Sequence, residues 1–295
     1  MGTFTAADGS QLYYTDEGFG LPILALAGLT RNTGDFDHVA PHLLKSEAVR
    51  LIRMDYRVRG QSDLADPASY TIPQESADAI ALLDHLSIDK AAIIGTSRGG
   101  IIAMMLAATH KHRLLGVALN DIGPHIEAAG LSDIKDYIGR NPTQATLADA
   151  ADFRARAWSH FNGVPLARWL HEVTNHYVET ANGLIIKYDP KLRDAVLGSD
   201  IKLAPDLWPL YEKLADLPLA LLRGDASDLL SAVTFDQMRN LRPDAHAATV
   251  LGRGHVPFLD EPESLAVLNG WLLSRSRIPI RRCRRPTPRK SPLSP

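Results

Sequence analysis

Residues 93–104 read Ile93-Ile94-Gly95-Thr96-Ser97-Arg98-Gly99-Gly100-Ile101-Ile102-Ala103-Met104. An apolar run meets Gly-x-Ser-x-Gly and continues as a helix-forming apolar run, which is the pattern of a serine nucleophile on a sharp strand-to-helix turn. Because Gly95 and Gly99 lack a Cβ, a strand and a helix can pack closely around a strained serine. The helix start directs free N–H groups and the positive end of its dipole toward the hydroxyl. The stretch predicts that Ser97 is a nucleophile and that the Arg98 N–H is an oxyanion donor; the alternative is a serine that only caps a helix.

The composition is that of an ordinary globular protein. The chain has 295 residues, of which 45% are hydrophobic and 22% charged, with a formal net charge of −2. This length and composition allow one domain with a large core, or one domain with a sizeable insertion. The end of the chain differs, because residues 276–295 contain no acid and carry Arg277, Arg281, Arg282, Arg284, Arg285, Arg289 and Lys290. We expect the basic, proline-rich tail (residues 275–295) to be disordered, with binding of nucleic acid or an anionic membrane as the alternative.

Several classes of protein are excluded by what the sequence does not contain. No apolar run is long enough to span a membrane, and the first residues match neither a signal peptide nor a myristoylation motif. The single cysteine, Cys283, lies in the basic tail and so cannot form an internal disulfide or a thiolate metal cluster. We therefore expect a cytoplasmic protein that acts on a small molecule, without a nucleic-acid or membrane partner, as a monomer or homodimer.

Short β-rich runs alternate with amphipathic helical stretches, which predicts a mostly parallel sheet covered on both faces. The expected strands are residues 11–15, 23–27, 50–54, 91–94, 115–119, 219–223 and 247–251, and the expected helices are residues 73–86, 100–110 and 262–273. The alternation ends after residue 119. Residues 124–214 contain no clear buried strand but show helical patterns at 147–161 and 164–177, together with Trp158, Trp169 and Trp208. We expect a helical insertion there, in which most of the tryptophans fill a local core.

Four segments, in chain order, give the sequence a clear resemblance to the α/β-hydrolase superfamily over residues 3–274. They are Leu26-Ala27-Gly28-Leu29-Thr30-Arg31-Asn32, Asp55-Tyr56-Arg57-Val58-Arg59-Gly60-Gln61-Ser62-Asp63, the turn at Ser97, and Gly254-His255 followed by Phe258-Leu259-Asp260-Glu261-Pro262. Ala27 replaces the usual histidine or proline, and Val58 replaces the first glycine of its turn. The resemblance implies a doubly wound, eight-stranded, mostly parallel sheet (residues 1–123 and 215–274) with a helical cap (residues 124–214) inserted after the sixth strand.

The serine requires a base, and an acid that orients the base. His255 is the candidate base, because it sits on a glycine-flanked loop after the last expected strand, where the superfamily places its histidine. For the acid, residues 221–230 end the seventh strand of the superfamily pattern, where relatives carry Gly-x-x-Asp. Here the fourth position is Ser227, and we favour Asp228, one residue beyond. Asp225 on the same turn and Asp121 after the sixth strand remain alternatives.

The remaining candidates surround this set. The resemblance implies that the backbone N–H groups of Leu29 and Arg98 form an oxyanion hole. The side chains of Arg98 and Arg31 could bind a substrate carboxylate or form structural ion pairs. No metal or organic cofactor is expected. His110 and His112 lack a third ligand, and Gly18-Phe19-Gly20 precedes a strand and lacks the third glycine of a dinucleotide fingerprint.

We therefore expect a serine hydrolase that cleaves a small carboxylic ester or lactone through an acyl-enzyme. The same fold and triad also serve hydrolysis of carbon–carbon bonds and acyl transfer. A third interpretation, a ligand-binding protein without catalysis, is disfavoured by the intact set of serine, histidine and acid.

Overall fold

A computed structural model describes residues 1–45, 48–198 and 206–274. Its main feature is an eight-stranded sheet in the order β1-β2-β4-β3-β5-β6-β9-β10. The strands are β1 (Gly2–Thr5), β2 (Gln11–Gly18), β3 (Leu21–Leu26), β4 (Val49–Met54), β5 (Ala91–Thr96), β6 (Leu114–Asn120), β9 (Leu219–Gly224) and β10 (His246–Val250). Only β2 pairs antiparallel with its neighbours, and β3 to β6, β9 and β10 pair in parallel. The mostly parallel sheet is confirmed.

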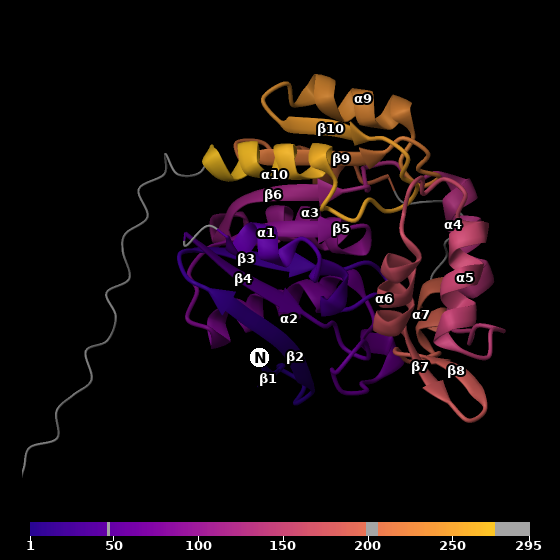
Figure 1. Ribbon diagram of the computed structural model, residues 1–295. Coiled ribbons are helices and arrows are strands. Elements are labelled where there is room, and N and C mark those ends of the chain that lie inside the picture. The colour runs from indigo at the N-terminus through magenta and orange to yellow at the C-terminus, as the bar shows by residue number, and fades with distance from the viewer. Residues whose placement is uncertain (46–47, 199–205, 275–295) are drawn as a thin grey trace, which may run out of the picture.

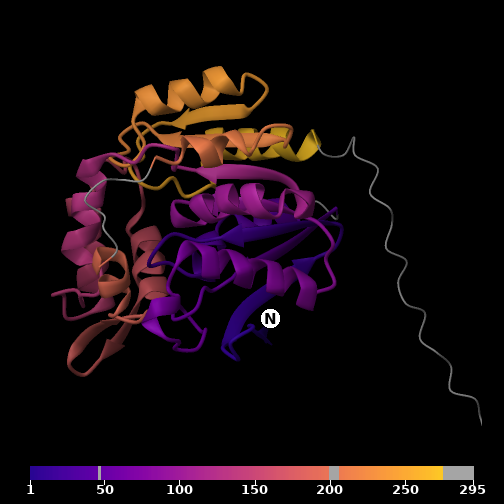
Figure 2. The same cartoon turned by 180° about the vertical axis from the view of Figure 1, so that it is seen from behind.

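Helices cover both faces of the sheet, as Figures 1 and 2 show from opposite sides. They are α1 (Ala40–Leu44), α2 (Ile72–His85), α3 (Arg98–Thr109), α9 (Ala232–Leu241) and α10 (Pro262–Leu273). Alternate residues of β3 belong to different core clusters: Leu24 and Leu26 pack on the side of α2, α3 and α9, whereas Ile23 and Ala25 pack on the side of α1 and α10. A strand covered on both faces is apolar throughout, and this explains the continuous apolar runs of the central strands.

The segment between β6 and β9 is here called the inserted segment (residues 124–214), and most of its described elements lie beyond the carboxyl ends of the parallel strands (Figure 1). Its elements are α4 (Ala128–Tyr137), α5 (Leu147–Ala157), α6 (Leu166–His176), β7 (Tyr177–Thr180), β8 (Gly183–Ile186), α7 (Leu192–Gly198) and α8 (Trp208–Glu212). Trp169 and Val173 of α6 are buried in a small core of its own, which also includes Leu184. Tyr211 of α8, by contrast, belongs to the main core on the face of the sheet that α2, α3 and α9 cover.

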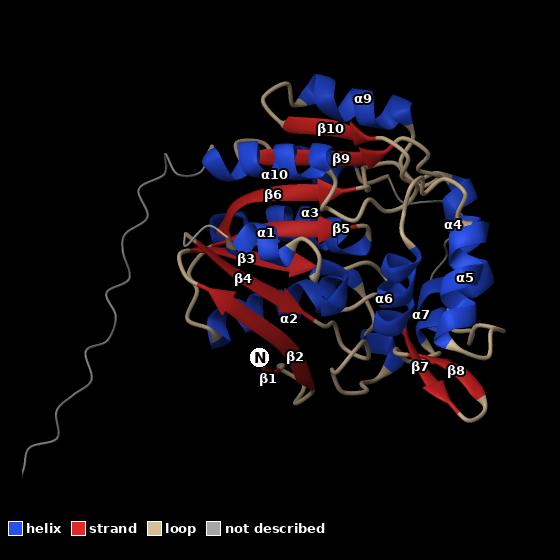
Figure 3. Ribbon diagram, in the orientation of Figure 1, coloured by secondary structure: helices blue, strands red, loops and turns tan. Residues whose placement is uncertain are grey.

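Three strands of the structure, β1, β7 and β8, have no counterpart among the expected strands. The inserted segment is not purely helical, because β7 and β8 form an antiparallel pair (Figure 3). Each strand has only four residues, and β7 has none that is fully buried. Strands this short do not show a recognisable alternation of apolar and polar residues. The edge strand β1 was also missed, because Phe4 is its one buried residue.

The structure does not test two of the expectations from the sequence, the disordered tail and the division into core and cap. The basic tail (residues 275–295) lies outside the described residues, and the division into core and cap remains a prediction. Among the described residues, no helix is both long and apolar enough to cross a membrane.

Candidate active site

Ser97 occupies the turn between β5 and α3, where it is the N-cap residue of α3 with φ 50° and ψ −115°. This backbone conformation lies outside the regions that side-chain-bearing residues prefer, and it persists only when the surrounding structure enforces it. The two glycines of the motif provide the required space. A Cβ on Gly99 would lie 2.1 Å from the Leu26 carbonyl oxygen, and one on Gly95 would lie 2.5 Å from the Gly99 carbonyl oxygen. The steric reason inferred for these glycines is therefore confirmed.

The structure brings His255 to Ser97 across 158 residues of sequence. His255 lies on the loop between β10 and α10, and its Nε2 is 3.0 Å from the Ser97 Oγ. Its other ring nitrogen, Nδ1, is 2.7 Å from Oδ2 of Asp121. A serine, a histidine and a carboxylate thus form a continuous chain of hydrogen bonds, which is the arrangement that removes a proton from a serine hydroxyl.

Asp121 is fully buried at the carboxyl end of β6 and has φ 53°, in the left-handed region that aspartate tolerates better than most residues. Its carboxylate is held from three directions. Oδ1 accepts a hydrogen bond from the Gly224 N–H at 2.8 Å, and Oδ2 accepts one from the Ser227 hydroxyl at 2.6 Å in addition to its contact with His255. These bonds leave the carboxylate with a defined orientation toward the imidazole.

The preference for Asp228 as the partner of His255 is wrong: the structure places Asp121 there. Asp228 is exposed on the loop after β9. Asp225 is also exposed and accepts a hydrogen bond from the Arg253 N–H at 3.0 Å. Partial burial alone would raise the pKa of Asp225, but hydrogen bonds from the backbone of Gly252, Arg253 and Ala226 lower it.

The sequence did contain a signal for this arrangement. β6 and β9 are adjacent and parallel, so their carboxyl ends reach the same place beside His255. Ser227 stands where relatives carry the acid, and it supplies a hydroxyl to Asp121 instead. A hydroxyl at that position, combined with an aspartate directly after β6, is the sequence signal that Asp121 rather than Asp228 faces His255.

The two candidate oxyanion donors belong to two separate segments, the loop after β3 and the start of α3. Leu29 is in a turn closed by the Arg31 N–H and the Gly28 carbonyl at 3.2 Å, and Arg98 is the first residue of α3. Within the described parts of the chain, neither the Leu29 nor the Arg98 backbone N–H donates a hydrogen bond to another group. Both are therefore free to bind a substrate oxygen.

The side chain of Arg98 forms a structural ion pair. Its Nε donates to Glu75 Oε2 at 2.6 Å, and its Nη2 donates to the Tyr70 carbonyl at 3.2 Å. Glu75 is fully buried on α2. The sequence left open whether the Arg98 guanidinium binds a substrate carboxylate or forms a structural ion pair. The structure shows the ion pair.

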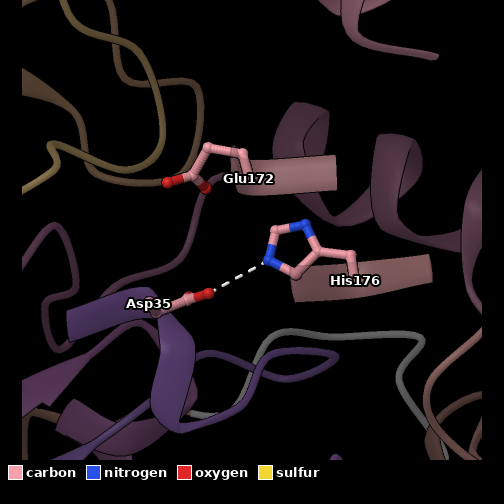
Figure 4. A group of neighbouring side chains, drawn as sticks. All are labelled: Asp35, Glu172 and His176. Carbon is pink, nitrogen blue, oxygen red and sulfur yellow. Dashed lines mark hydrogen bonds and ion pairs between the residues drawn. The ribbon is translucent and has the colours of Figure 1, made fainter. Parts of the chain in front are cut away.

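Arg31 also has protein partners, on α6 of the inserted segment. Its Nη1 lies 3.1 Å from Glu172 Oε2, 2.8 Å from His176 Nε2 and 3.7 Å from Asp35 Oδ1. Asp35 belongs to the short 3-10 turn Thr33–Phe36, and Figure 4 shows it hydrogen bonded to His176. Arg154 of α5 approaches His176 from the other side, with its Nη1 3.0 Å from Nδ1. The guanidinium of Arg31 is therefore already neutralised.

The ligand atoms of Asp35, Glu172 and His176 lie within 4.8 Å of one another, which is the geometry of a potential metal site. Arg31 lies within salt-bridge distance of both carboxylates, and Arg154 contacts His176, so the protein itself supplies the positive charge of this cluster. Burial lowers the pKa of His176 well below its usual value, and Arg31 and Arg154 lower it further. Burial raises the pKa of Asp35, against the opposing effect of Arg31.

A small cavity adjoins these groups. It is lined by Thr96 and Val256, the sequence neighbours of Ser97 and His255, and by Trp158, Phe258 and Asn120. Arg31, Asp35 and Glu172 form part of the same wall. About 20 Å³ of this cavity is open to a water-sized molecule, so it has room for a water rather than for a whole substrate.

Comparison with known proteins identifies the family to which the chain belongs. The model of the Alpha/beta hydrolase family matches residues 23–268. The chain is 29% identical to the 3-hydroxybutyrate-oligomer hydrolase of Cupriavidus necator, over 81% of this chain and 84% of that protein. It is 26% identical to the pimeloyl-[acyl-carrier protein] methyl ester esterase of Aromatoleum aromaticum, over 66% and 78% of the two chains.

A solved structure shows the same fold. An alpha/beta hydrolase from Novosphingobium aromaticivorans superimposes with a TM-score of 0.84 at 36% identity, covering 92% of this chain and 97% of that one. The match to the family model spans most of the chain, and the relatives are hydrolases. The chain belongs to the alpha/beta hydrolase family and is a hydrolase of that fold.

Proposed function

We propose that Ser97, His255 and Asp121 form a catalytic triad that hydrolyses a small, uncharged carboxylic ester through an acyl-enzyme. The observation that carries this proposal is the unbroken chain of hydrogen bonds from Ser97 Oγ through both ring nitrogens of His255 to Asp121. In it, His255 Nε2 accepts the serine proton as Oγ attacks the ester carbonyl carbon. Asp121 holds Nδ1–H, which sets the tautomer and stabilises the imidazolium that forms.

The rest of the cycle uses the same groups. The carbonyl oxygen becomes an oxyanion, to which the N–H groups of Leu29 and Arg98 donate hydrogen bonds. The imidazolium then gives its proton to the leaving alcohol, and the acyl group remains on Ser97. Water, deprotonated by His255, attacks the acyl-enzyme and releases the carboxylic acid.

The nature of the substrate is supported by the charged groups around Arg31 and by the relatives. A substrate carboxylate beside Arg31 would also face Glu172 and Asp35, which already accept from that guanidinium or lie close to it. This disfavours an anionic group there and replaces the expectation that Arg31 binds a substrate carboxylate. An ester, rather than another carbonyl compound, is supported by the similarity to a methyl ester esterase.

The proposal is tested by activity-based labelling with a fluorophosphonate. We expect the wild-type protein to be labelled on Ser97 and the Ser97→Ala variant not to be labelled. On p-nitrophenyl acetate and butyrate, kcat/KM of the variant should fall by at least roughly ten-thousandfold, because the nucleophile is lost. Ser274→Ala, which changes an exposed serine at the end of α10, is the matched control and should retain labelling at Ser97. Full ester turnover by Ser97→Ala would overturn the assignment, and a panel with small lactones would define the substrate class.

A further inference from the structure

Glu75 joins two arginines, Arg59 and Arg98, in a largely buried network. Glu75 lies in the first turn of α2 and is 0% exposed. Its Oε1 is 2.9 Å from Arg59 Nη1, and its Oε2 is 2.6 Å from Arg98 Nε. Arg59 is 1% exposed, so both the carboxylate and this guanidinium are removed from solvent.

Each arginine leads to one of the two oxyanion donors. Arg59 Nε donates to the Leu29 carbonyl at 3.0 Å, which holds the peptide next to the Leu29 N–H. Arg98 carries the other donor on its own backbone, at the start of α3. The Leu29 loop and the start of α3 are separate segments, and Glu75 connects them through one side chain on each side.

We propose that Glu75 is a positioning residue that sets the distance and orientation between the Leu29 and Arg98 N–H groups of the oxyanion hole. This inference rests on the proposed serine-hydrolase function. Oxyanion stabilisation depends on donors that are already in place when charge develops, so a small displacement of either donor weakens it. Glu75 does not contact the substrate and acts only through the two arginines.

The charges of the network favour the same role. Two guanidiniums share a single carboxylate, and among the described residues the salt bridges of Arg59 and Arg98 are both to Glu75. Within the described residues, one positive charge of this network therefore has no carboxylate of its own at salt-bridge distance. Burial alone would raise the pKa of Glu75, but Arg59 and Arg98 outweigh burial and lower it, so the carboxylate stays ionised.

The chain offers a matched control on the same helix. Asp78, one turn after Glu75 on α2, is 1% exposed and accepts two hydrogen bonds of 2.8 Å from the buried Arg57. It is also a buried carboxylate paired with an arginine, but its side chain touches neither Leu29 nor Arg98. Asp78→Asn should therefore reproduce the loss of stability that follows from breaking a buried ion pair, without the effect on the oxyanion donors.

The experiment compares Glu75→Gln, Glu75→Asp and Asp78→Asn with the wild type, well below their melting temperatures. The measured quantities are kcat and KM for p-nitrophenyl butyrate and the inhibition constant of 1,1,1-trifluoroacetone. In the ketone adduct the Ser97 Oγ–C bond forms, the C=O π bond becomes C–O⁻, and the serine proton passes to His255. The adduct therefore places an oxyanion between the two donors.

For Glu75→Gln we expect kcat and the affinity for the ketone to fall together, on the order of ten- to hundredfold, with little change in KM. Glu75→Asp should recover part of both, and Asp78→Asn should retain wild-type values although its melting temperature falls. If Glu75→Gln does not fold, Arg98→Met separates Glu75 from one donor and should show the same joint loss.

The outcomes distinguish the inference from the function on which it rests. If the wild type is labelled at Ser97 but Glu75→Gln keeps its kcat and ketone affinity, or gains in either, the positioning role is overturned and the proposed function stands. Equal losses in Asp78→Asn would also overturn it. If the wild type neither reacts with a fluorophosphonate nor hydrolyses esters, the proposed function is overturned, and the positioning role with it.

Discussion

At the residue scale, the most specific feature of the site is the carboxylate of Asp121. It accepts hydrogen bonds from Gly224, Ser227 and His255, so both of its oxygens are used. A neutral amide in its place would present an N–H to some of these donors and would favour the wrong tautomer of His255. Asp228, at the position favoured by comparison with the superfamily pattern, is exposed to solvent.

We therefore expect Asp121→Asn to lower kcat by roughly ten-thousandfold with a folded structure, as loss of the correct histidine tautomer does in serine hydrolases. Asp228→Asn, a change of the same chemical kind, should leave kcat within about twofold, because surface substitutions seldom disturb a site. Steady-state kinetics on one ester, with circular dichroism to check folding, measures both. A loss confined to Asp228→Asn would return the acid to the β9 turn.

At the scale of the elements, the turn between β5 and α3 depends on close contact between backbones. The Gly99 N–H donates to the Ala27 carbonyl at 3.1 Å, which ties the start of α3 to the loop that carries Leu29. A Cβ on Gly99 would lie 2.1 Å from a backbone oxygen of Leu26, and backbone cannot move aside as a flexible side chain can. The strand, the helix and the oxyanion loop are therefore positioned by one another.

Gly99→Ala should lower the free energy of unfolding by about 1 to 3 kcal/mol, or more if the turn cannot relax, and should reduce activity at the same time. Gly198→Ala, near the end of α7, is the matched control, because a Cβ there meets nothing within 4 Å among the described atoms. Alanine in a helix should leave stability unchanged or slightly raised. Urea denaturation of the two variants measures the difference, and equal stability of Gly99→Ala and wild type would contradict the packing argument.

At the scale of the whole molecule, the inserted segment is attached to the core through the charged cluster at Arg31. Arg31 and Asp35 come from the core, whereas Glu172, His176 and Arg154 come from the inserted segment. His176 is 6% exposed, and each of its ring nitrogens faces an arginine: Arg154 Nη1 is 3.0 Å from Nδ1, and Arg31 Nη1 is 2.8 Å from Nε2. Two cationic neighbours favour the neutral imidazole. A second proton on the ring would place a third positive charge against the two arginines.

This cluster predicts a loss of stability in mild acid. Burial and the two arginines hold the pKa of His176 in the folded protein below its value of 6.5 in the unfolded chain. As the pH falls below 6.5, the unfolded chain binds a proton that the folded protein does not, so folding becomes less favourable by on the order of 1 kcal/mol per pH unit. The raised pKa of Asp35 acts in the opposite direction as carboxylates titrate at lower pH.

The measurement is the free energy of urea unfolding between pH 7.5 and 5.5. We expect the wild type to lose more stability over this range than His176→Gln, while His112→Gln, which changes an exposed histidine, should follow the wild type. Comparing slopes rather than absolute stabilities removes any constant effect of each substitution. Identical slopes for His176→Gln and wild type would show that His176 is not kept neutral by its surroundings.

The sequence by itself determined the parts of this protein that depend on local backbone and burial. The glycines around Ser97 indicate a turn in which a Cβ would clash with the backbone. The apolar runs indicate strands that are covered on both faces. The position of His255 on the loop after the last strand makes it the candidate base. The short strands β1 and β7 were missed because too few of their residues are buried for an alternation to appear.

Only the tertiary structure decided between Asp121 and Asp228, and between an ion pair and a substrate contact for Arg98. Both choices depend on which side chains meet across neighbouring elements. Ser97 and His255 can be proposed from their own loops, whereas the carboxylate that meets His255 depends on the register of β6 beside β9 and on the hydroxyl of Ser227. Glu75 in sequence is an ordinary acid in the first turn of a helix, and its link to both oxyanion donors exists only where α2, α3 and the loop after β3 pack together.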